Sequence, residues 1–215
     1  MKPSEPKNPD EYFRDTEHAV RHLYAGLDSC WSYYQRALEH WDISQVGQPM
    51  TLEKAAALKR YLELADRYFD LRFSEATFAG AILQMAYVAI RLYSRNNSIP
   101  SNCAGFVRPT KKSAIPFCIG QERHGIPIGL IIYAGRNQYN HWDDEEPHEV
   151  TKNVFEALST AFYPNVLFDL AFELSNPTVN VYAREILLTV LGWKSYERYL
   201  TEMKSLLVLP ETAKA

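Results

Sequence analysis

The N-terminal part of the chain carries apolar and aromatic side chains at steps of three and four residues. This spacing places them on one face of an α-helix, whereas a half-buried strand alternates at every second residue. We expect a long first helix that begins at Asp10 and is broken near residues 26–29. The side chains that form its apolar face are Tyr12, Phe13, Ala19, Val20, Leu23, Tyr24, Leu27, Trp31, Tyr34, Leu38 and Trp41.

Two further helices are predicted in the first half of the chain. Thr51 is suited to cap the second helix, because its hydroxyl can accept a hydrogen bond from a backbone N–H of the first turn. One apolar stripe runs along that helix: Ala55, Leu58, Leu62, Ala65 and Phe69. The third helix, over residues 74–92, is apolar nearly all round, which is typical of the centre of a bundle. Its most apolar window, residues 76–90, is shorter than the ~20 residues of a membrane span.

The second half of the chain predicts more helices after a long irregular segment. Prolines and glycines interrupt residues 96–125, and a loop of this length is often functional. The next helix has Pro127 in its first turn, and further apolar segments cover residues 148–162, 164–174, 179–191 and 195–209. Gly192 separates the last two as a C-cap. The sequence therefore predicts an all-α bundle: a flexible arm over residues 1–9, the bundle over residues 10–163, and a C-terminal helical extension of the same domain over residues 164–215.

The charge balance limits what the chain can bind. A formal net charge of -3 and a pI near 6.1 argue against a protein that coats polyanions generally. Any contact with nucleic acid must come from a local basic surface. The clearest basic cluster lies in the irregular segment, as either an RNA-binding surface or a solvated loop: Arg108, Lys111, Lys112, Arg123 and His124.

The cysteines and the N-terminus bear on the compartment. Cys30, Cys103 and Cys118 form no CxxC pair, and an odd number of cysteines suits a reducing environment. The first residues lack the apolar core of a signal peptide. We expect a cytoplasmic protein.

A polar motif follows the apolar run at residues 126–134. Arg136, Asn137 and His141 form the pattern Arg-Asn-x-x-x-His. Arginine is a permanent cation whose planar fork suits phosphate oxygens, and histidine can give or take a proton near neutral pH. On a regular helix, residues five apart point roughly 140° away from each other, so Arg136 and His141 meet one phosphate only if the helix bends or ends, or if two copies of the chain face each other. Asn137 shares a face with His141 and can hydrogen-bond one imidazole nitrogen.

This motif resembles the Arg-x(4–6)-His signature of the HEPN superfamily of helical RNA-cleaving domains. The resemblance implies an HEPN-like bundle that dimerises with its two motifs in a shared cleft and cuts RNA without metal or cofactor. It implies that Arg136 neutralises the phosphate, that His141 transfers a proton and that Asn137 orients it. The 2′-hydroxyl then attacks, leaving 2′,3′-cyclic phosphate and 5′-hydroxyl ends. A toxin or antiviral effector, with a neutralising antitoxin or sensor as partner, is the implied biology. Where some HEPN toxins have the tyrosine that receives a silencing nucleotide, this chain has Asp143.

Alternative interpretations remain for the same residues. The motif can be a helix end at which Arg136 and His141 make surface contacts with Asp143 or Glu146. Histidines and carboxylates between residues 141 and 148 are suitable metal ligands, but the one Glu-x-x-His spacing, Glu145 to His148, falls at a proline-broken turn. We therefore expect an acidic helix N-terminus there and no metal.

A second class of function is a non-catalytic helical module that binds RNA or nucleotide. No glycine-rich phosphate loop or nucleophile elbow is present in the sequence. Cys118 with His124 is a conceivable thiol–base pair that rests on spacing alone.

Overall fold

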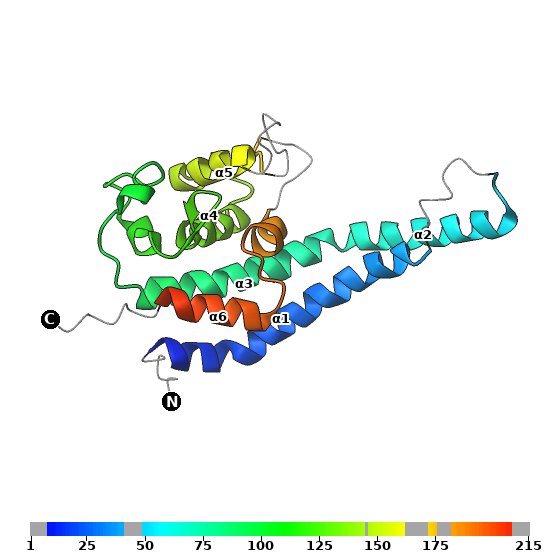
Figure 1. Cartoon of the computed structure of the whole chain (residues 1–215), viewed down its shortest axis with the longest axis horizontal. Helices are drawn as coiled ribbons and strands as arrows, with labels where there is room; N and C mark the ends of the chain where they lie inside the picture. The colour runs from blue at the N-terminus through cyan, green and yellow to red at the C-terminus, as the bar shows by residue number, and fades with distance from the viewer. Residues whose placement is uncertain (1–7, 41–48, 145, 162–171, 176–181, 208–215) are drawn as a thin grey trace.

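The computed structural model describes residues 8–40, 49–144, 146–161, 172–175 and 182–207. This part is mostly helical, so the predicted all-α class is confirmed. Most of the predicted N-terminal arm and most of the predicted helical segment 164–174 lie outside the described residues. Three long helices form an extended arm, and shorter helices pack on one half of it (Figure 1).

Helix α1, Pro9–Leu38, is continuous, so the predicted break near residues 26–29 is wrong. The Asn8 side chain caps it by accepting a hydrogen bond from the Glu11 N–H at 2.9 Å, and Pro9 occupies the first turn. Gly26 has a packing role here. A Cβ at Gly26 would lie 2.8 Å from the ring of Phe78 on the neighbouring helix α3, so glycine lets the two helices approach.

Helices α2, Leu52–Asp70, and α3, Arg72–Tyr93, are separated by Leu71 and run nearly end to end along α1 (Figure 1). Thr51 caps α2 as predicted, since its Oγ1 accepts a hydrogen bond from the Lys54 N–H at 3.3 Å. The predicted apolar stripe of α2 is only partly correct. Ala65 is buried, but Leu62 and Phe69 are 50% and 58% exposed. The reason is that α2 packs mainly against α1 and covers only one narrow face.

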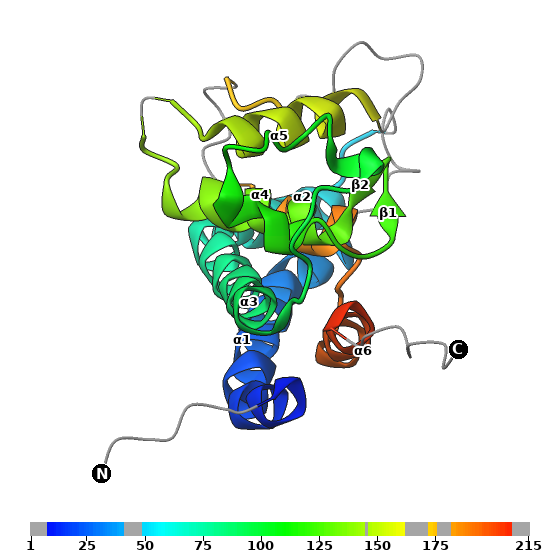
Figure 2. The same cartoon turned by 90° about the vertical axis from the view of Figure 1, so that its left-hand side faces the viewer.

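Helix α3 is the central element. It packs against α1 on one side and α4, Ile128–Asn140, on the other, while α5, Glu149–Ala161, covers α4. Helix α6, Tyr196–Leu207, returns to pack beside α1 and α3, as Figure 2 shows in the end view. Among the described helices, only α3 is long and apolar enough to cross a membrane. Half of its most apolar window is buried inside the protein, as in the core helix of a bundle.

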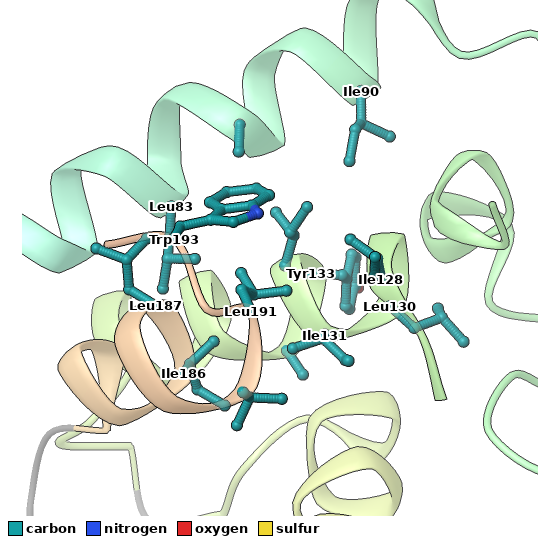
Figure 3. Packing of buried hydrophobic residues seen from close by; sticks show 14 of the residues in the cluster. Leu83, Ile90, Ile128, Leu130, Ile131, Tyr133, Ile186, Leu187, Leu191 and Trp193 are labelled. Atoms are coloured by element: carbon teal, nitrogen blue, oxygen red, sulfur yellow. The ribbon is translucent and has the colours of Figure 1, made fainter. Parts of the chain in front are cut away.

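The main core lies between α3, α4 and a π-helical segment, η4, Glu185–Val190 (Figure 3). Trp193 is fully buried in it, and its carbonyl accepts a hydrogen bond from the Tyr24 hydroxyl at 3.2 Å. Gly192 has a φ of 64°, so the predicted C-cap is confirmed: this left-handed conformation favours glycine. The C-terminal segment thus contributes to the same core as α1 and α3.

The irregular segment over residues 96–125 is ordered by short elements. Two 3-10 turns, η2 at Ser101–Cys103 and η3 at Lys112–Phe117, precede a hairpin of β1, Glu122–Arg123, and β2, Ile126–Pro127. The strands are antiparallel and too short for an alternating pattern to reveal them. Asn96 ties the segment to the end of α3, donating a hydrogen bond to the Ile115 carbonyl at 2.6 Å. Phe117 is fully buried under it.

Candidate functional site

The predicted motif lies at the C-terminal end of α4. The first two turns of α4 are buried, and Pro127 stands just before the helix rather than within its first turn. Coverage then decreases along the motif. Asn137 and Gln138 are buried, Arg136 is partly covered, and the side chain of His141 is 41% exposed. The motif is therefore held by the core at one end and open to solvent at the other.

Arg136 is fixed by α3. Its Nε donates a hydrogen bond to Gln84 Oε1 at 2.6 Å, and its guanidinium lies over the ring of Tyr87 at 4.6 Å. Its Nη1 donates to Asn137 Oδ1 at 2.9 Å. These two hydrogen bonds use only part of the guanidinium's donors, so the group is held in place while retaining donors for an anion.

His141 is the residue at which α4 ends. Its backbone N–H donates to the Asn137 carbonyl at 3.0 Å, and its φ of −130° departs from the helix. Its Nδ1 lies 3.1 Å from Asp144 Oδ2. A carboxylate at this position favours the tautomer with the proton on Nδ1 and leaves the lone pair on Nε2. Asp144, rather than Asn137, is the side chain that contacts the imidazole.

Arg136 and His141 are not brought together within one chain by any contact among the described residues. Arg136 lies against α3, whereas His141 lies beside the start of α5, with its ring 5.1 Å from that of His148. Asn137 connects the two sides, because it accepts the hydrogen bond from Arg136 and also lines a cavity shared with His141.

This cavity has a volume of about 120 Å³, which is room for a few water molecules or an ion. Gln138 is fixed at its edge, since its Oε1 accepts a hydrogen bond from the Tyr182 N–H at 3.1 Å. The Thr151 hydroxyl is buried there and has no hydrogen-bond partner among the described residues. The cavity is lined by Asn137, Gln138, His141, Trp142, Asp144, Pro147, His148, Thr151 and Leu174.

Part of the predicted basic cluster lies at the start of α5. Arg108 Nε is 2.6 Å from Glu149 Oε1, and Lys111 Nζ is 3.6 Å from Glu149 Oε2. Glu149 is the first residue of α5 and directly follows His148. Two cationic side chains are thereby held at the start of α5, next to His148 in the sequence. Lys112, at the start of η3, is also exposed.

The other two predicted basic residues lie elsewhere. Arg123 Nη2 is 2.7 Å from Glu202 Oε1 on α6, so its guanidinium is part of an internal ion pair. His124 sits in the hairpin turn with a φ of 53°. Burial, followed by the charge of Arg123, lowers the pKa of His124, which favours the neutral ring at pH 7. The structure therefore separates the predicted cluster into two places.

The proposed thiol–base pair does not have the electrostatics of a nucleophile. Cys118 is buried, and burial together with a hydrogen bond involving Cys103 raises its pKa to about 12. Such a thiol stays protonated and unreactive near neutral pH.

A larger cavity of about 690 Å³ lies away from the motif, between α1, α3 and η4. It contains Glu75, which is 1% exposed, with Arg184 Nε at 3.1 Å from its Oε2. The sequence pattern does not single out this pair. The contacts of Gln84 and Tyr87 with Arg136 were not predicted either, because contacts between residues on different helices produce no recognisable spacing in the sequence.

Comparison with known proteins adds no family to these observations. No family model, no curated protein and no solved structure matches the chain.

Proposed function

We propose that the chain is a metal-independent endoribonuclease whose helical bundle is HEPN-like and is extended by C-terminal helices. The observation that carries the proposal is the half-exposed imidazole of His141 with a carboxylate on its Nδ1 side. This arrangement leaves Nε2 to act as a general base towards solvent. The imidazole belongs to the Arg-Asn-x-x-x-His motif on which the sequence resemblance to the HEPN superfamily rests.

In the proposed reaction, His141 Nε2 takes the proton of an RNA 2′-hydroxyl. The 2′-oxygen attacks the adjacent phosphorus, and the bond from phosphorus to the 5′-oxygen breaks. The products are a 2′,3′-cyclic phosphate and a 5′-hydroxyl, whose proton comes from a second imidazole or from water. Asp144 stabilises the imidazolium that forms.

Arg136 is proposed to neutralise the charge that develops on the phosphate oxygens. Its contacts with Gln84 and Tyr87 support this role, because a guanidinium that is already held loses little entropy on binding. Asn137 contributes by positioning Arg136, in place of the orienting role towards His141 that the resemblance implies.

We propose a homodimer as the active form. Arg136 faces α3 and His141 faces the start of α5, so one chain does not present both to one phosphate. Two chains that meet at the motif end of α4 would each supply the group that the other lacks. Arg108, Lys111 and Lys112 are proposed to guide RNA towards this cleft, in a cytoplasmic toxin or antiviral effector controlled by an antitoxin or sensor.

The test compares RNA cleavage by the parent protein, His141→Ala and the matched control His22→Ala, which removes an exposed histidine from α1. We expect His141→Ala to lose ~10²–10⁴-fold in rate, with unchanged helicity by circular dichroism. All rates are measured in metal-free buffer, where the parent should still cleave and His22→Ala should leave the rate unchanged. Equal cleavage by parent and His141→Ala would remove the assignment.

A non-catalytic RNA- or nucleotide-binding module is the second candidate. It is favoured by the three contacts that already engage Arg136, since a side chain used for packing need not take part in chemistry. Purified protein that binds RNA and never cuts it, at any concentration at which it dimerises, would select this function.

A further inference from the structure

Three side chains with metal-binding atoms gather in the connection between α4 and α5. They are His141, Asp144 and His148, and one ligand atom of each lies within 4.8 Å of the others. We infer that these residues bind one divalent ion of the zinc class, and that the bound ion withdraws His141 from RNA cleavage. The second half of this inference rests on the proposed function, and the first half does not.

The spacing of the ligands suits such an ion. Two ligands of a tetrahedral zinc ion lie roughly 3.3 Å apart, given bonds of about 2.0–2.1 Å. His141 Nδ1 and Asp144 Oδ2 are already 3.1 Å apart. The ligand atom of His148 lies within 4.8 Å of the other two, so a shift of roughly 1.5 Å in this exposed side chain completes a tetrahedral set. No helix has to shift.

The backbone holds the three residues at fixed places. The His141 N–H is bound to the last turn of α4, and the Asp144 N–H donates to the His141 carbonyl at 3.3 Å. The His148 carbonyl accepts a hydrogen bond from the Lys152 N–H of α5 at 2.9 Å. The connection is therefore anchored on both sides of the site, which lowers the entropy lost when an ion binds.

The donor set selects the kind of ion. Two imidazoles and one carboxylate suit zinc and its neighbours, whereas magnesium and calcium prefer oxygen ligands alone. Three protein ligands leave a fourth position for water. The buried hydroxyl of Thr151 lines the same cavity and lacks a hydrogen-bond partner among the described residues. Water on the ion would supply that partner.

A bound ion would stop His141 from acting as a base, because the ion determines which ring nitrogen carries the proton. When the ion takes the lone pair of Nδ1, the neutral imidazole carries its proton on Nε2. Nε2 then has no lone pair with which to accept a proton from the 2′-hydroxyl. Binding of the ion and cleavage of RNA exclude each other at this residue.

A second pair of histidines has to be removed before binding is measured. His18 and His22 lie one turn apart on α1, with ring centroids 4.2 Å apart, and can bind zinc by themselves. All titrations therefore use protein that carries His22→Ala and has been stripped of metal with EDTA and dialysed.

Calorimetric titration with zinc chloride measures the binding. We expect one ion per chain in the His22→Ala protein, at least tenfold weaker binding with His148→Ala added, and unchanged binding with the control Asp143→Ala. Absorption bands of tetrahedral cobalt(II) should appear and disappear in the same variants. Absence of binding, or binding that His148→Ala leaves unchanged, overturns the site.

Cleavage measured with the same proteins tests the regulatory half. We expect micromolar zinc to inhibit the His22→Ala protein strongly and the protein with His148→Ala added at least tenfold less, each relative to its own rate in metal-free buffer. Equal inhibition of both overturns the regulation. If neither protein cleaves RNA in metal-free buffer, the proposed function and the regulation fail together, while the titration still decides the metal site.

Discussion

At the scale of single residues, Asp144 is the side chain that the sequence interpretation placed in an acidic turn and the structure places on the imidazole of His141. Its neighbour Asp143 is also an exposed carboxylate, and no ion pair of its own is found among the described residues. The turn after α4 directs the Asp144 side chain, and not that of Asp143, towards the imidazole of His141.

Asp144→Ala should therefore slow RNA cleavage by roughly tenfold or more, because the imidazole loses the group that fixes its tautomer. The loss should be smaller than that in His141→Ala, which removes the base itself. Cleavage is measured in metal-free buffer, with Asp143→Ala as the matched control. If Asp144→Ala and Asp143→Ala cleave equally fast, Asp144 does not orient His141.

Glu75 is the other residue whose environment has a measurable consequence. Burial raises the pKa of its carboxyl group, even though the charge of Arg184 and a hydrogen bond with Tyr68 oppose the shift. The folded state thus holds the proton more tightly than the unfolded state does. The resulting stability is present below the ordinary pKa of 4.5 and is lost as the pH rises through the folded pKa.

This linkage predicts how Glu75→Gln changes the pH dependence of unfolding. The free energy of unfolding of the parent, relative to that of Glu75→Gln, should fall as the pH is raised from 4.5 towards 7. Urea unfolding at several pH values measures it. The exposed Glu63→Gln on α2 serves as the matched control. A difference that rises with pH would mean that the pair with Arg184 outweighs burial.

At the scale of elements, α4 depends on a close contact with η3. A Cβ at Gly129 would lie 2.3 Å from the backbone carbonyl oxygen of Phe117, a distance that no side-chain rotation can relieve. Glycine in the first turn of α4 costs helix propensity, about 1 kcal/mol relative to alanine. The clash of an added Cβ with the Phe117 carbonyl oxygen therefore outweighs the helix propensity that alanine would add.

Gly129→Ala should lower the free energy of unfolding by about 1–3 kcal/mol, although alanine is the better helix former. Gly105→Ala is the matched control, because a Cβ there meets nothing within 4 Å. Urea unfolding of both variants measures the difference. Equal stability of the two would show that η3 moves away without cost.

The elements also show what the sequence could predict. The existence of α1 to α6 followed from apolar periodicity, and the Thr51 cap followed from local chemistry, so these were predicted correctly. The interruption at Gly26 and the stripe through Leu62 and Phe69 were wrong, because only the partners α3 and α1 decide which face is covered. The contact of Asp144 with His141 depends on the conformation of an irregular turn. Such a turn leaves no periodic pattern in the sequence from which the contact could be predicted.

At the scale of the whole molecule, the helices that carry the candidate site occupy one half of a long arm. The body formed by α4, α5 and η4 packs on part of α3, and α2 extends beyond it along α1 (Figure 1). Arg136 and His141 face different neighbours within this body. The proposed cleft therefore requires a second chain.

A mixture of two inactive variants tests this arrangement. Arg136→Ala and His141→Ala should each be inactive, whereas their mixed dimer should recover part of the activity, because one cleft combines the arginine of one chain with the histidine of the other. Co-expression with two affinity tags isolates the mixed dimer. Failure to recover activity, together with a stable monomer by sedimentation that cleaves RNA fully, would contradict the shared cleft.

Helix α4 is buried along its first turns and ends in solvent at His141. This difference in burial decides which substitutions the fold tolerates during evolution. Substitutions over residues 128–134 disturb packing and are expected to reduce the amount of protein in the cell. Substitution of His141, whose side chain is 41% exposed, spares the core, so the protein accumulates with the proposed chemistry altered. A lineage can therefore lose or exchange the chemistry by a single change while every element that presents it persists. Related chains with intact cores and different residues at this helix end are the expected outcome of such drift.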